Sequence, residues 1–295
     1  LDAGRSAVPV FEAALQDQEL RSKSAYVLER LRKFEEALPE VRRKLRKNIT
    51  KSLVARPKLR IRALGGMQIS LNDQKIDSSV WQSRVQRDLL FYLLRNKHGV
   101  TKEILQDTFW GNIEQIGSQL TNVLYKIRHL LGEDIILFED GRYRFNRALD
   151  YEYDVENFLA LAASLPKEPD PQRRMQICQQ MTHLYRGKYL PEADGVWATV
   201  EREHLHNLYM AAKLELAEHY LCAGDYLASS NHCWGAIENS PCNEEAYRMA
   251  MRVAAALGDR AGIDKHYRLC KQVLEKNCNV TPSPETHQLY RQLMR

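Results

Sequence analysis

The sequence predicts a mainly α-helical protein with small β-sheets, in which a compact mixed domain precedes an all-helical domain. Three observations carry this prediction. The spacing of apolar residues changes from helical to alternating at Leu59, three helical patterns then lead into a short hairpin pattern, and a 34-residue helical repeat occupies the end of the chain. The chain has 295 residues, which is enough for two domains of ordinary size.

Charge is unevenly distributed along the chain. Residues 1–56 carry 13 basic and 8 acidic side chains, residues 57–147 carry 14 and 10, and residues 148–295 carry 16 and 20. The excess of positive charge is therefore confined to the first half, which favours a polyanionic partner for that half. An excess of this size also arises by chance in soluble proteins, so charge alone does not identify the partner.

Residues 1–56 predict a helical segment followed by a basic linker. Apolar positions at helical spacing over 9–34, with a break near Gln16, resemble one helical repeat of the HEAT type, and a single repeat needs neighbours to bury its apolar face. A run rich in Lys and Arg covers 42–62, with a linker expected at 48–57. Because the chain begins with Leu and shows no signal-peptide pattern, we expect it to be a piece of a longer protein.

Residues 57–147 begin with a sheet and a helix. The alternating stretch 59–76 contains the turn pairs Gly65-Gly66 and Asn72-Asp73, which predicts a small antiparallel sheet. A helical pattern follows over 82–95, with apolar residues on one face.

Two further helices and a hairpin complete this domain. Thr101 is expected to cap a short helix that ends at Trp110, with Ile104, Leu105 and Phe109 facing inward. The third helix is expected over 113–131 and ends at a glycine, and two apolar runs around Asp140-Gly141 predict a hairpin. A sheet, three helices and a hairpin in this order indicate a winged helix-turn-helix of the OmpR-like variety.

Residues 148–295 predict only helices. The stretch 223–241 aligns with 257–275 at an offset of 34, pairing Gly224-Asp225 with Gly258-Asp259. This is the period of tetratricopeptide repeats, in which each helix pair buries its face by stacking on the next pair. HLYRGKYLP at 183–191 has a similar pattern and is interpreted as an earlier, degenerate turn. The four tryptophans lie in apolar patterns and are expected in the core.

Several classes of site lack support in the sequence. The six cysteines form no C-x-x-C pair and have no histidine at metal spacing, so free, mostly buried thiols are expected and a zinc site is not. No phosphate-binding loop, nucleophile elbow or paired metal-ligand motif occurs, and His204 and His206 do not share a helix face. No apolar run reaches the roughly 18 to 20 residues of a membrane span. We therefore expect no enzyme, cofactor, metal or membrane partner.

Ten short motifs occur in a fixed order from residue 59 onward. They are LRIRALGGMQISLNDQKI (59–76), RDLLFYLL (87–94), KEILQDTFW (102–110), LTNVLYKIRHLLG (120–132), GRYRF (141–145), YDVENF (153–158), YRGKYLP (185–191), WATVEREHL (197–205), LGDRAGIDKHY (257–267) and TPSPETHQLY (281–290). The series resembles bacterial transcriptional activators of the Streptomyces antibiotic regulatory protein (SARP) type, in which a bacterial transcriptional activator domain follows the winged helix. Gly111 departs from the proline often found there, and the helix at 120–132 is less basic than in many members.

The resemblance implies a sequence-specific transcriptional activator in the bacterial cytoplasm. It would bind direct repeats in double-stranded promoter DNA, as a homodimer on DNA, and contact the RNA polymerase holoenzyme. The main alternative is an interaction scaffold whose winged helix serves as a docking module without DNA binding, because Lys126 and Arg128 are the only full cations of the third helix.

Candidate DNA-binding residues follow from the helical period. Apolar residues at three and four residue spacing form one stripe of the third helix, which leaves a polar opposite face that fits the major groove. Gln119, Asn122 and Lys126 are the candidates for base contacts, with Tyr125 for a thymine methyl group or the backbone. The full set of expected DNA contacts is Ser118, Gln119, Asn122, Tyr125, Lys126, Arg128, Arg142, Arg144, Arg84 and Arg87. Arg128 and Arg144 are expected to contact phosphate, and Arg142 at the hairpin tip is expected to contact phosphate or the minor groove. Arg84 and Arg87 either contact the DNA backbone or are only solvated.

Overall fold

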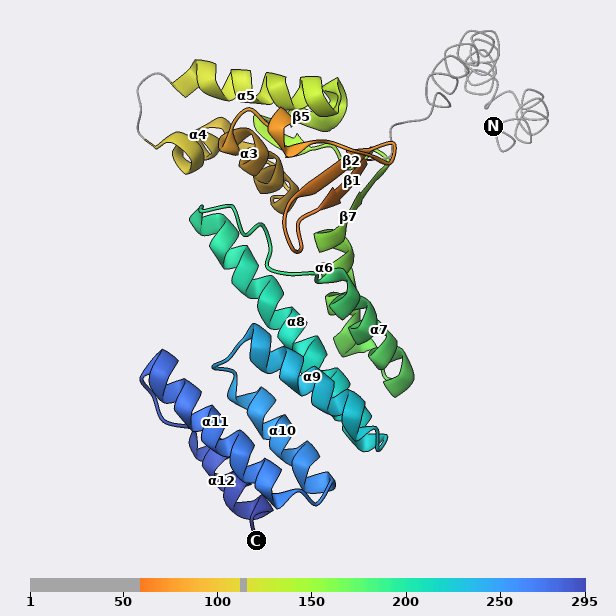
Figure 1. Cartoon of the computed structure of the whole chain (residues 1–295). Coiled ribbons are helices and arrows are strands. Elements are labelled where there is room, and N and C mark those ends of the chain that lie inside the picture. Colours follow the sequence, from red (N-terminus) through yellow and green to blue (C-terminus); the bar gives the residue numbers. More distant parts are fainter. Residues whose placement is uncertain (1–58, 112–115) are drawn as a thin grey trace, which may run out of the picture. The chain divides into compact units, whose positions relative to one another are not determined.

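The computed structural model describes residues 59–111 and 116–295, and side chains of the third helix from residue 118 onward (Figure 1). All of the described residues belong to one compact unit. The expected repeat at 9–34 and linker at 48–57 lie outside the described residues.

The first sheet joins the two predicted domains. Strands β1 (Leu59–Arg62), β2 (Gln68–Leu71) and β3 (Gln74–Lys75) form the predicted antiparallel sheet, and β7 (Tyr151–Tyr153) pairs with β1 in parallel. The prediction of helices alone after residue 148 is therefore wrong at β7. A strand of three residues is too short to show an alternating apolar pattern in the sequence. Tyr153 is buried because the sheet and the next helix cover it. The predicted boundary at 147/148 falls just before this strand.

Three helices build the core of the winged helix: α3 (Arg84–Arg95), α4 (Lys102–Trp110) and α5 (Ile116–Leu131). A one-turn helix, η1 (Ser78–Val80), precedes them. The Ser83 hydroxyl caps α3 by accepting from the backbone N–H of Gln86, and leucines on one face of α3 are fully buried. Helix α3 packs against α4, α5 and the hairpin, so it is the central support of the domain.

Helix α4 differs in detail from the prediction. Thr101 occupies the N-cap position, but its side chain makes no capping hydrogen bond to the helix. Leu105 is fully buried, whereas Ile104 is 47% exposed, so the prediction that Ile104 faces inward is wrong. A nine-residue helix buries a narrow stripe, and Leu105 and Phe109, four residues apart, fill it.

The hairpin forms as predicted. Strands β5 (Ile136–Glu139) and β6 (Arg142–Phe145) pair antiparallel after a one-turn helix, η2 (Glu133–Ile135), and β4 (Val100–Thr101) adds a third strand. Asp140 and Gly141 both have positive φ, +51° and +74°. Two-residue turns of this kind match the twist of paired strands and require residues that tolerate the left-handed region.

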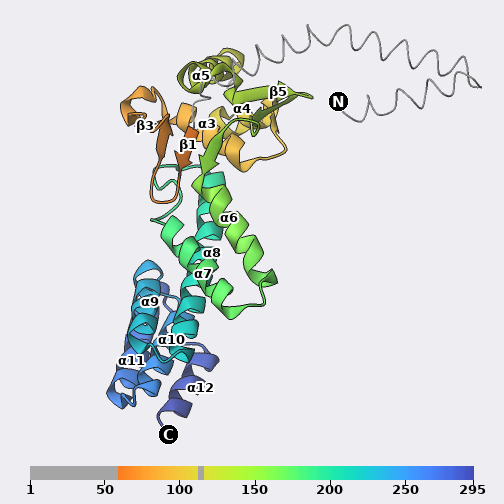
Figure 2. The same ribbon diagram turned by 90° about the vertical axis from the view of Figure 1, so that its right-hand side faces the viewer.

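The remaining chain is helical. It contains α6 (Asp154–Ser164), η3 (Leu165–Lys167), α7 (Pro171–Leu184), α8 (Val196–Cys222), α9 (Tyr226–Asn239), α10 (Glu244–Ala256), α11 (Arg260–Cys278) and α12 (Pro284–Leu293) (Figure 2). The predicted repeat is confirmed, because α8 and α9 meet at a turn that has the same hydrogen bonds as the turn between α10 and α11. Asp225 and Asp259 cap the second helix of each pair by accepting from the N–H of Ala228 and Gly262.

The segment between α7 and α8 does not form such a turn. Leu64 bridges to Tyr189, and the N–H of Gly65 donates to the carbonyl of Lys188 at 3.1 Å. A Cβ on Gly65 would lie 3.1 Å from the backbone of Arg186, so glycine permits this close approach. The predicted degenerate turn is instead an extended segment that attaches the helical domain to the end of β1.

Asp154 completes this junction. Its carboxylate accepts from the backbone N–H of Ala63 at 2.9 and 3.0 Å and from that of Leu64 at 3.0 Å. Burial raises the pKa of this carboxyl, and the backbone hydrogen bonds oppose that shift. The first residue of α6 therefore satisfies the two N–H groups at which the sheet ends.

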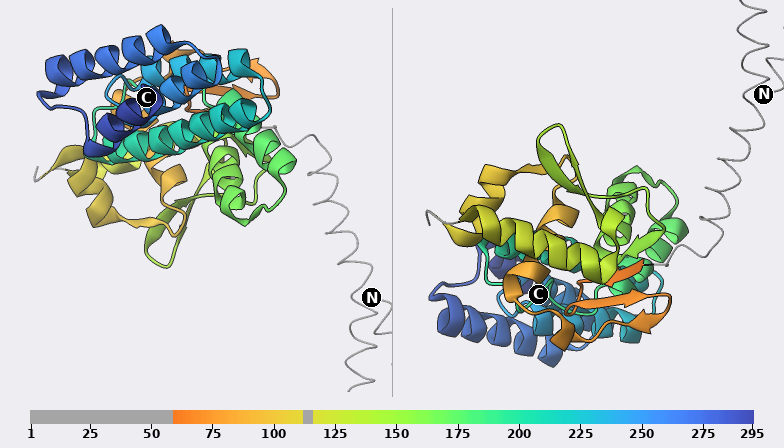
Figure 3. Two further views of the ribbon diagram at one scale, coloured as in Figure 1. Left: turned by 90° about the horizontal axis from the view of Figure 1, so that it is seen from below. Right: turned by 90° about the horizontal axis from the view of Figure 1, so that it is seen from above.

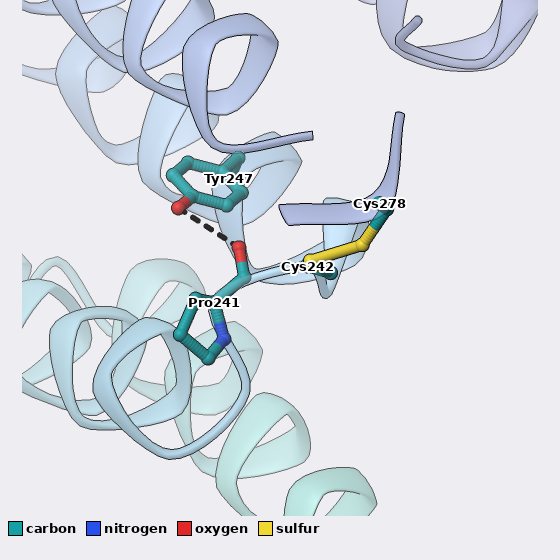
Figure 4. Close-up of a disulfide and its surroundings, with 4 residues drawn as sticks. All are labelled: Pro241, Cys242, Tyr247 and Cys278. Atoms are coloured by element: carbon teal, nitrogen blue, oxygen red, sulfur yellow. Dashed lines mark hydrogen bonds between the residues drawn. A yellow bond between two sulfur atoms is a disulfide. The ribbon is translucent and has the colours of Figure 1, made fainter. Parts of the chain in front are cut away.

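The expectation of free cysteines is wrong for one pair. Cys242, in the loop before α10, and Cys278, at the end of α11, form a disulfide (Figure 4). Cys178, Cys233 and Cys270 are free and buried, as predicted, and burial raises the pKa of each of these thiols to about 12. Cys242 and Cys278 are 36 residues apart in sequence, so their pairing depends on the packing of α10 and α11 rather than on a motif.

Two histidines at equivalent repeat positions, His232 and His266, pack against aromatic rings of the helical domain. His232 stacks on Tyr220, His266 packs against Trp234, and the Nδ1 of each histidine is buried without a hydrogen-bond partner among the described residues. Burial is the main cause that lowers the pKa of both rings. Lys213 lowers the pKa of His232 further, and Lys265 and Asp259 act in opposite directions on His266.

We expect stability to fall as the pH drops below about 6.5, because the unfolded chain then binds protons that the folded histidines exclude. Replacing both residues by phenylalanine, which keeps the stacking, should reduce the loss of melting temperature between pH 7.5 and 5.5. Thermal melts at these two pH values measure it, with exposed His204→Gln as the control. An equal loss in the double variant and the parent would contradict this assignment.

Candidate nucleic-acid interface

Helix α5 has the two faces that the sequence predicts. Leu120, Leu124, Ile127 and Leu131 are buried. The opposite face presents Ser118, Gln119, Asn122 and Tyr125 as exposed side chains, with Lys126 half-buried. Seen from above, α5 crosses the near side of the winged helix (Figure 3). The structure therefore brings five of the six predicted residues of this helix to one surface, and Arg128 is the exception.

An aromatic pair extends the exposed face of α5. The ring of Tyr125 is 61% exposed and stacks on His129 with a centroid distance of 6.0 Å and an interplanar angle of 12°. The helical period places His129 on this polar face, although His129 was not among the predicted contacts. The pair gives the end of this face a flat apolar surface beside its amides.

Arg128 has a structural position. Its Nη2 donates to the carbonyl of Ile136 at 2.9 Å, which ties α5 to the first strand of the hairpin. Its Nε is buried and has no partner among the described residues. The guanidinium therefore braces the helix against the hairpin, which leaves it little freedom to reach a phosphate.

The hairpin presents one exposed and one paired arginine. Arg142 is exposed next to the turn, and its Nη1 donates to the carbonyl of Gly99 at 3.3 Å. Arg144 forms an ion pair with Glu139 across the hairpin, and both side chains are roughly half exposed. Exposed pairs of this kind contribute little to stability, so either arginine can exchange its present partner for a phosphate.

The two arginines of α3 point to other partners. Arg84 pairs with Asp194, in the segment before α8, and the Nε of Arg87 lies 3.6 Å from the carboxylate of Asp88. Burial raises the pKa of Asp88, and Arg87 opposes that shift. Both arginines therefore have partners within the protein, and neither partner lies on α5.

Arg147 supports the hairpin and was not predicted. Its Nη2 donates to the carbonyl of Leu94 at 2.6 Å and to the Glu156 carboxylate at 3.0 Å. Glu156 also accepts from the hydroxyl of Tyr151 at 2.7 Å. Burial is the main cause that raises the pKa of Tyr151 to about 12, and Glu156 raises it further. This network connects the exit of β6 to α3 and α6. Its partners are too distant in sequence for a local pattern to show.

Other kinds of site find no support within the described residues. No group of three or more His, Cys, Asp or Glu side chains in 59–111 and 116–295 could hold a metal ion. None of the helices in this part of the chain combines the length and apolarity that crossing a bilayer requires.

Comparison with known proteins agrees with this architecture. Residues 153–294 match the family model described as bacterial transcriptional activator domain. The fold resembles Mycobacterium tuberculosis EmbR, solved in complex with a low-affinity phosphopeptide, with a TM-score of 0.68 at 16% identity over 81% of this chain. This chain spans 65% of that structure's chain. No curated protein sequence matches the chain.

Proposed function

We propose that the chain is a transcriptional regulator of the SARP type, because residues 153–294 match the bacterial transcriptional activator domain, and that it binds promoter DNA sequence-specifically through α5 and the hairpin. As an activator of this type it would bind direct repeats as a homodimer and contact the RNA polymerase holoenzyme. A cytoplasmic location in a bacterium follows from that role.

One observation carries the proposal: the exposed face of α5 bears two amide side chains above a fully buried apolar stripe. A helix fits the major groove of B-DNA, which is about 12 Å wide, and an Asn or Gln amide there pairs with both the N6 and N7 positions of adenine. Gln119 and Asn122 lie three residues apart and so occupy one side of the helix. Lys126 continues this line by one turn and can donate to guanine.

The cations divide into two groups by their place in the fold. Lys126, Arg142 and Arg144 lie on α5 and the hairpin, are at least partly accessible, and are assigned to bases, the minor groove or phosphate. Arg128 braces α5 against Ile136, and Arg84 and Arg87 of α3 pair with Asp194 and Asp88, so these three contribute to DNA binding only if those contacts open. Ser118 and Tyr125 remain assigned to the backbone and to a thymine methyl group.

This division predicts a modest salt dependence. Arg142 and Arg144 neutralising about two phosphates, with Lys126 assigned to a base, give a slope of about −2 in a plot of log affinity against log salt concentration. Most of the affinity for the correct site must then come from base contacts, so discrimination against random DNA should survive at physiological salt.

Selection from a random pool of DNA duplexes tests the proposal. The full chain should enrich one motif that contains adenines, protect a defined footprint on it, and show the dependence of affinity on salt concentration given above. Absence of any enriched sequence or footprint at physiological salt would contradict DNA recognition.

That negative outcome would favour the second candidate function, an interaction scaffold with the winged helix as a docking module. The observation behind it is that Lys126 is the sole accessible full cation among the described side chains of α5.

A further inference from the structure

An open groove with a mixed apolar and polar lining lies between α6 and α7, in the helical domain. The two helices pack side by side (Figures 1 and 2), and the groove has a volume of about 810 Å³. Its lining combines the apolar side chains of Leu161 and Leu184 with the amides of Asn157, Gln176 and Gln180. These three amides are exposed and make no hydrogen bond to another described residue. The DNA-binding surface proposed above uses none of them.

A smaller cleft of about 260 Å³ continues the groove toward β1. The two share Asn157, His183 and Leu184, so they form one continuous depression. Arg62 of β1 and Arg186, after α7, also line the cleft, and neither forms an ion pair with a described residue. The depression therefore has an amide-rich end and a cationic end.

The two carboxylates in the cleft already have partners. Glu152 pairs with the Nε of Arg60 at 3.1 Å, and Asp154 accepts from the backbone N–H groups of Ala63 and Leu64. The cations without an ion pair to a described residue are thus Arg62, whose charge lowers the pKa of Asp154, and Arg186. Their planar guanidinium groups match the geometry of a carboxylate and bind it through two parallel hydrogen bonds.

The amide-rich end fits a different chemical group. Each side-chain amide offers donors and an acceptor, which matches the alternating N–H and C=O groups of an extended polypeptide. Leu161 and Leu184 supply apolar contact for its side chains. The lining amides are exposed, which differs from the enclosed, mostly apolar sites that bury small molecules.

We propose that this depression binds an extended segment of a partner protein that carries an Asp or Glu, with its backbone against the amides of α6 and α7 and its carboxylate at Arg62 and Arg186. The partner's acidic residue sets the orientation of the segment. This surface is separate from the DNA-binding face of α5, so the chain holds DNA and a partner protein through different residues.

An array of random octapeptides probed with the full chain tests the proposal. Bound sequences are resynthesised with a fluorescein label, each beside a version in which the acid is replaced by its amide, and affinity is measured by fluorescence polarisation. The acidic peptides should bind about tenfold or more tightly than their amide versions, the size expected for charge-assisted hydrogen bonds.

Four variants locate the site. Arg62→Gln with Arg186→Gln should remove the preference for the acidic peptide and leave the amide peptide unchanged. Gln176→Ala with Gln180→Ala should weaken both peptides to a similar extent. Arg268→Gln, an exposed arginine of α11, is the matched control and should change neither. Arg186→Gln alone changes an exposed position outside the helices, so it tests the cationic end even if the double arginine variant misfolds. The folding of all variants is checked by thermal melting.

Three results would overturn the proposal. They are an array without bound peptides, binding that the acid-to-amide change does not affect, and binding that the two arginine substitutions do not affect. Displacement of the acidic peptide by random-sequence duplex DNA, with the same dependence on Arg62 and Arg186, would assign the cleft to nucleic acid instead.

Discussion

Arg202→Met is expected to lower the free energy of unfolding by about 3 kcal/mol, because three backbone carbonyls lose a charged donor at once. The Nε of Arg202 donates to the carbonyl of Tyr189 at 2.8 Å, and its Nη2 donates to those of Leu190 at 2.7 Å and Ala193 at 2.8 Å. All three carbonyls belong to buried residues of the segment between α7 and α8. Methionine retains the length and apolar character of the side chain, so the change removes mainly the hydrogen bonds.

The same substitution should loosen the attachment of the winged helix. The segment that Arg202 holds pairs with the end of β1, where the N–H of Leu190 donates to the carbonyl of Ala63 at 3.0 Å. Leu190 has a φ of +35°, which is unfavourable for a branched side chain and needs the surrounding contacts to maintain it. Hydrogen exchange should therefore show faster exchange at β1 and in residues 185–195 than in α10 and α11.

Thermal and urea unfolding measure this effect. For a unit of this size, a loss of about 3 kcal/mol corresponds to a decrease of about 6 to 12 °C in melting temperature. Arg173→Met is the matched control, because its side chain is 71% exposed on α7 and pairs only with Asp170 at 3.8 Å. A decrease no larger than that of Arg173→Met would show that the three hydrogen bonds are replaced by water at little cost.

Elements set by local chemistry could be predicted from the sequence. The Gly-Asp turns recur 34 residues apart because a glycine of positive φ and an aspartate cap are both needed to start the second helix of each pair. The Asp140-Gly141 hairpin follows from the same steric preference. The two faces of α5 follow from its period, which also located the amides of the candidate site.

Contacts between segments distant in sequence could not be predicted. Asp154 and Ala63 are 91 residues apart, and Arg147 and Leu94 are 53 apart. A sequence pattern shows that such polar residues exist but not which backbone groups they satisfy. The same limit applies to the present partners of Arg128 and Arg84, which are Ile136 and Asp194, and their contacts with DNA stay predictions.

The second prediction with a large expected effect concerns DNA recognition by α5. Gln119→Ala together with Asn122→Ala should abolish the preference for the selected DNA motif, and it should leave binding to random DNA nearly unchanged. Each bidentate base contact contributes about 1 to 3 kcal/mol of discrimination, so two contacts correspond to a loss of at least about thirtyfold in the ratio of specific to random affinity. Both side chains are exposed and alanine favours helix, so the melting temperature should not fall.

Two comparisons separate base contacts from phosphate contacts. Arg142→Ala should weaken binding to the motif and to random DNA alike, and reduce the salt slope by about one, because a phosphate contact carries no sequence information. Gln288→Ala, an exposed amide of α12, is the control and should change neither quantity. If the Gln119 and Asn122 double variant kept its preference for the motif, base recognition would have to lie outside the exposed face of α5. If it lost affinity for all sequences equally, the two amides would contact the phosphate backbone, and specificity would have to come from the shape of the DNA.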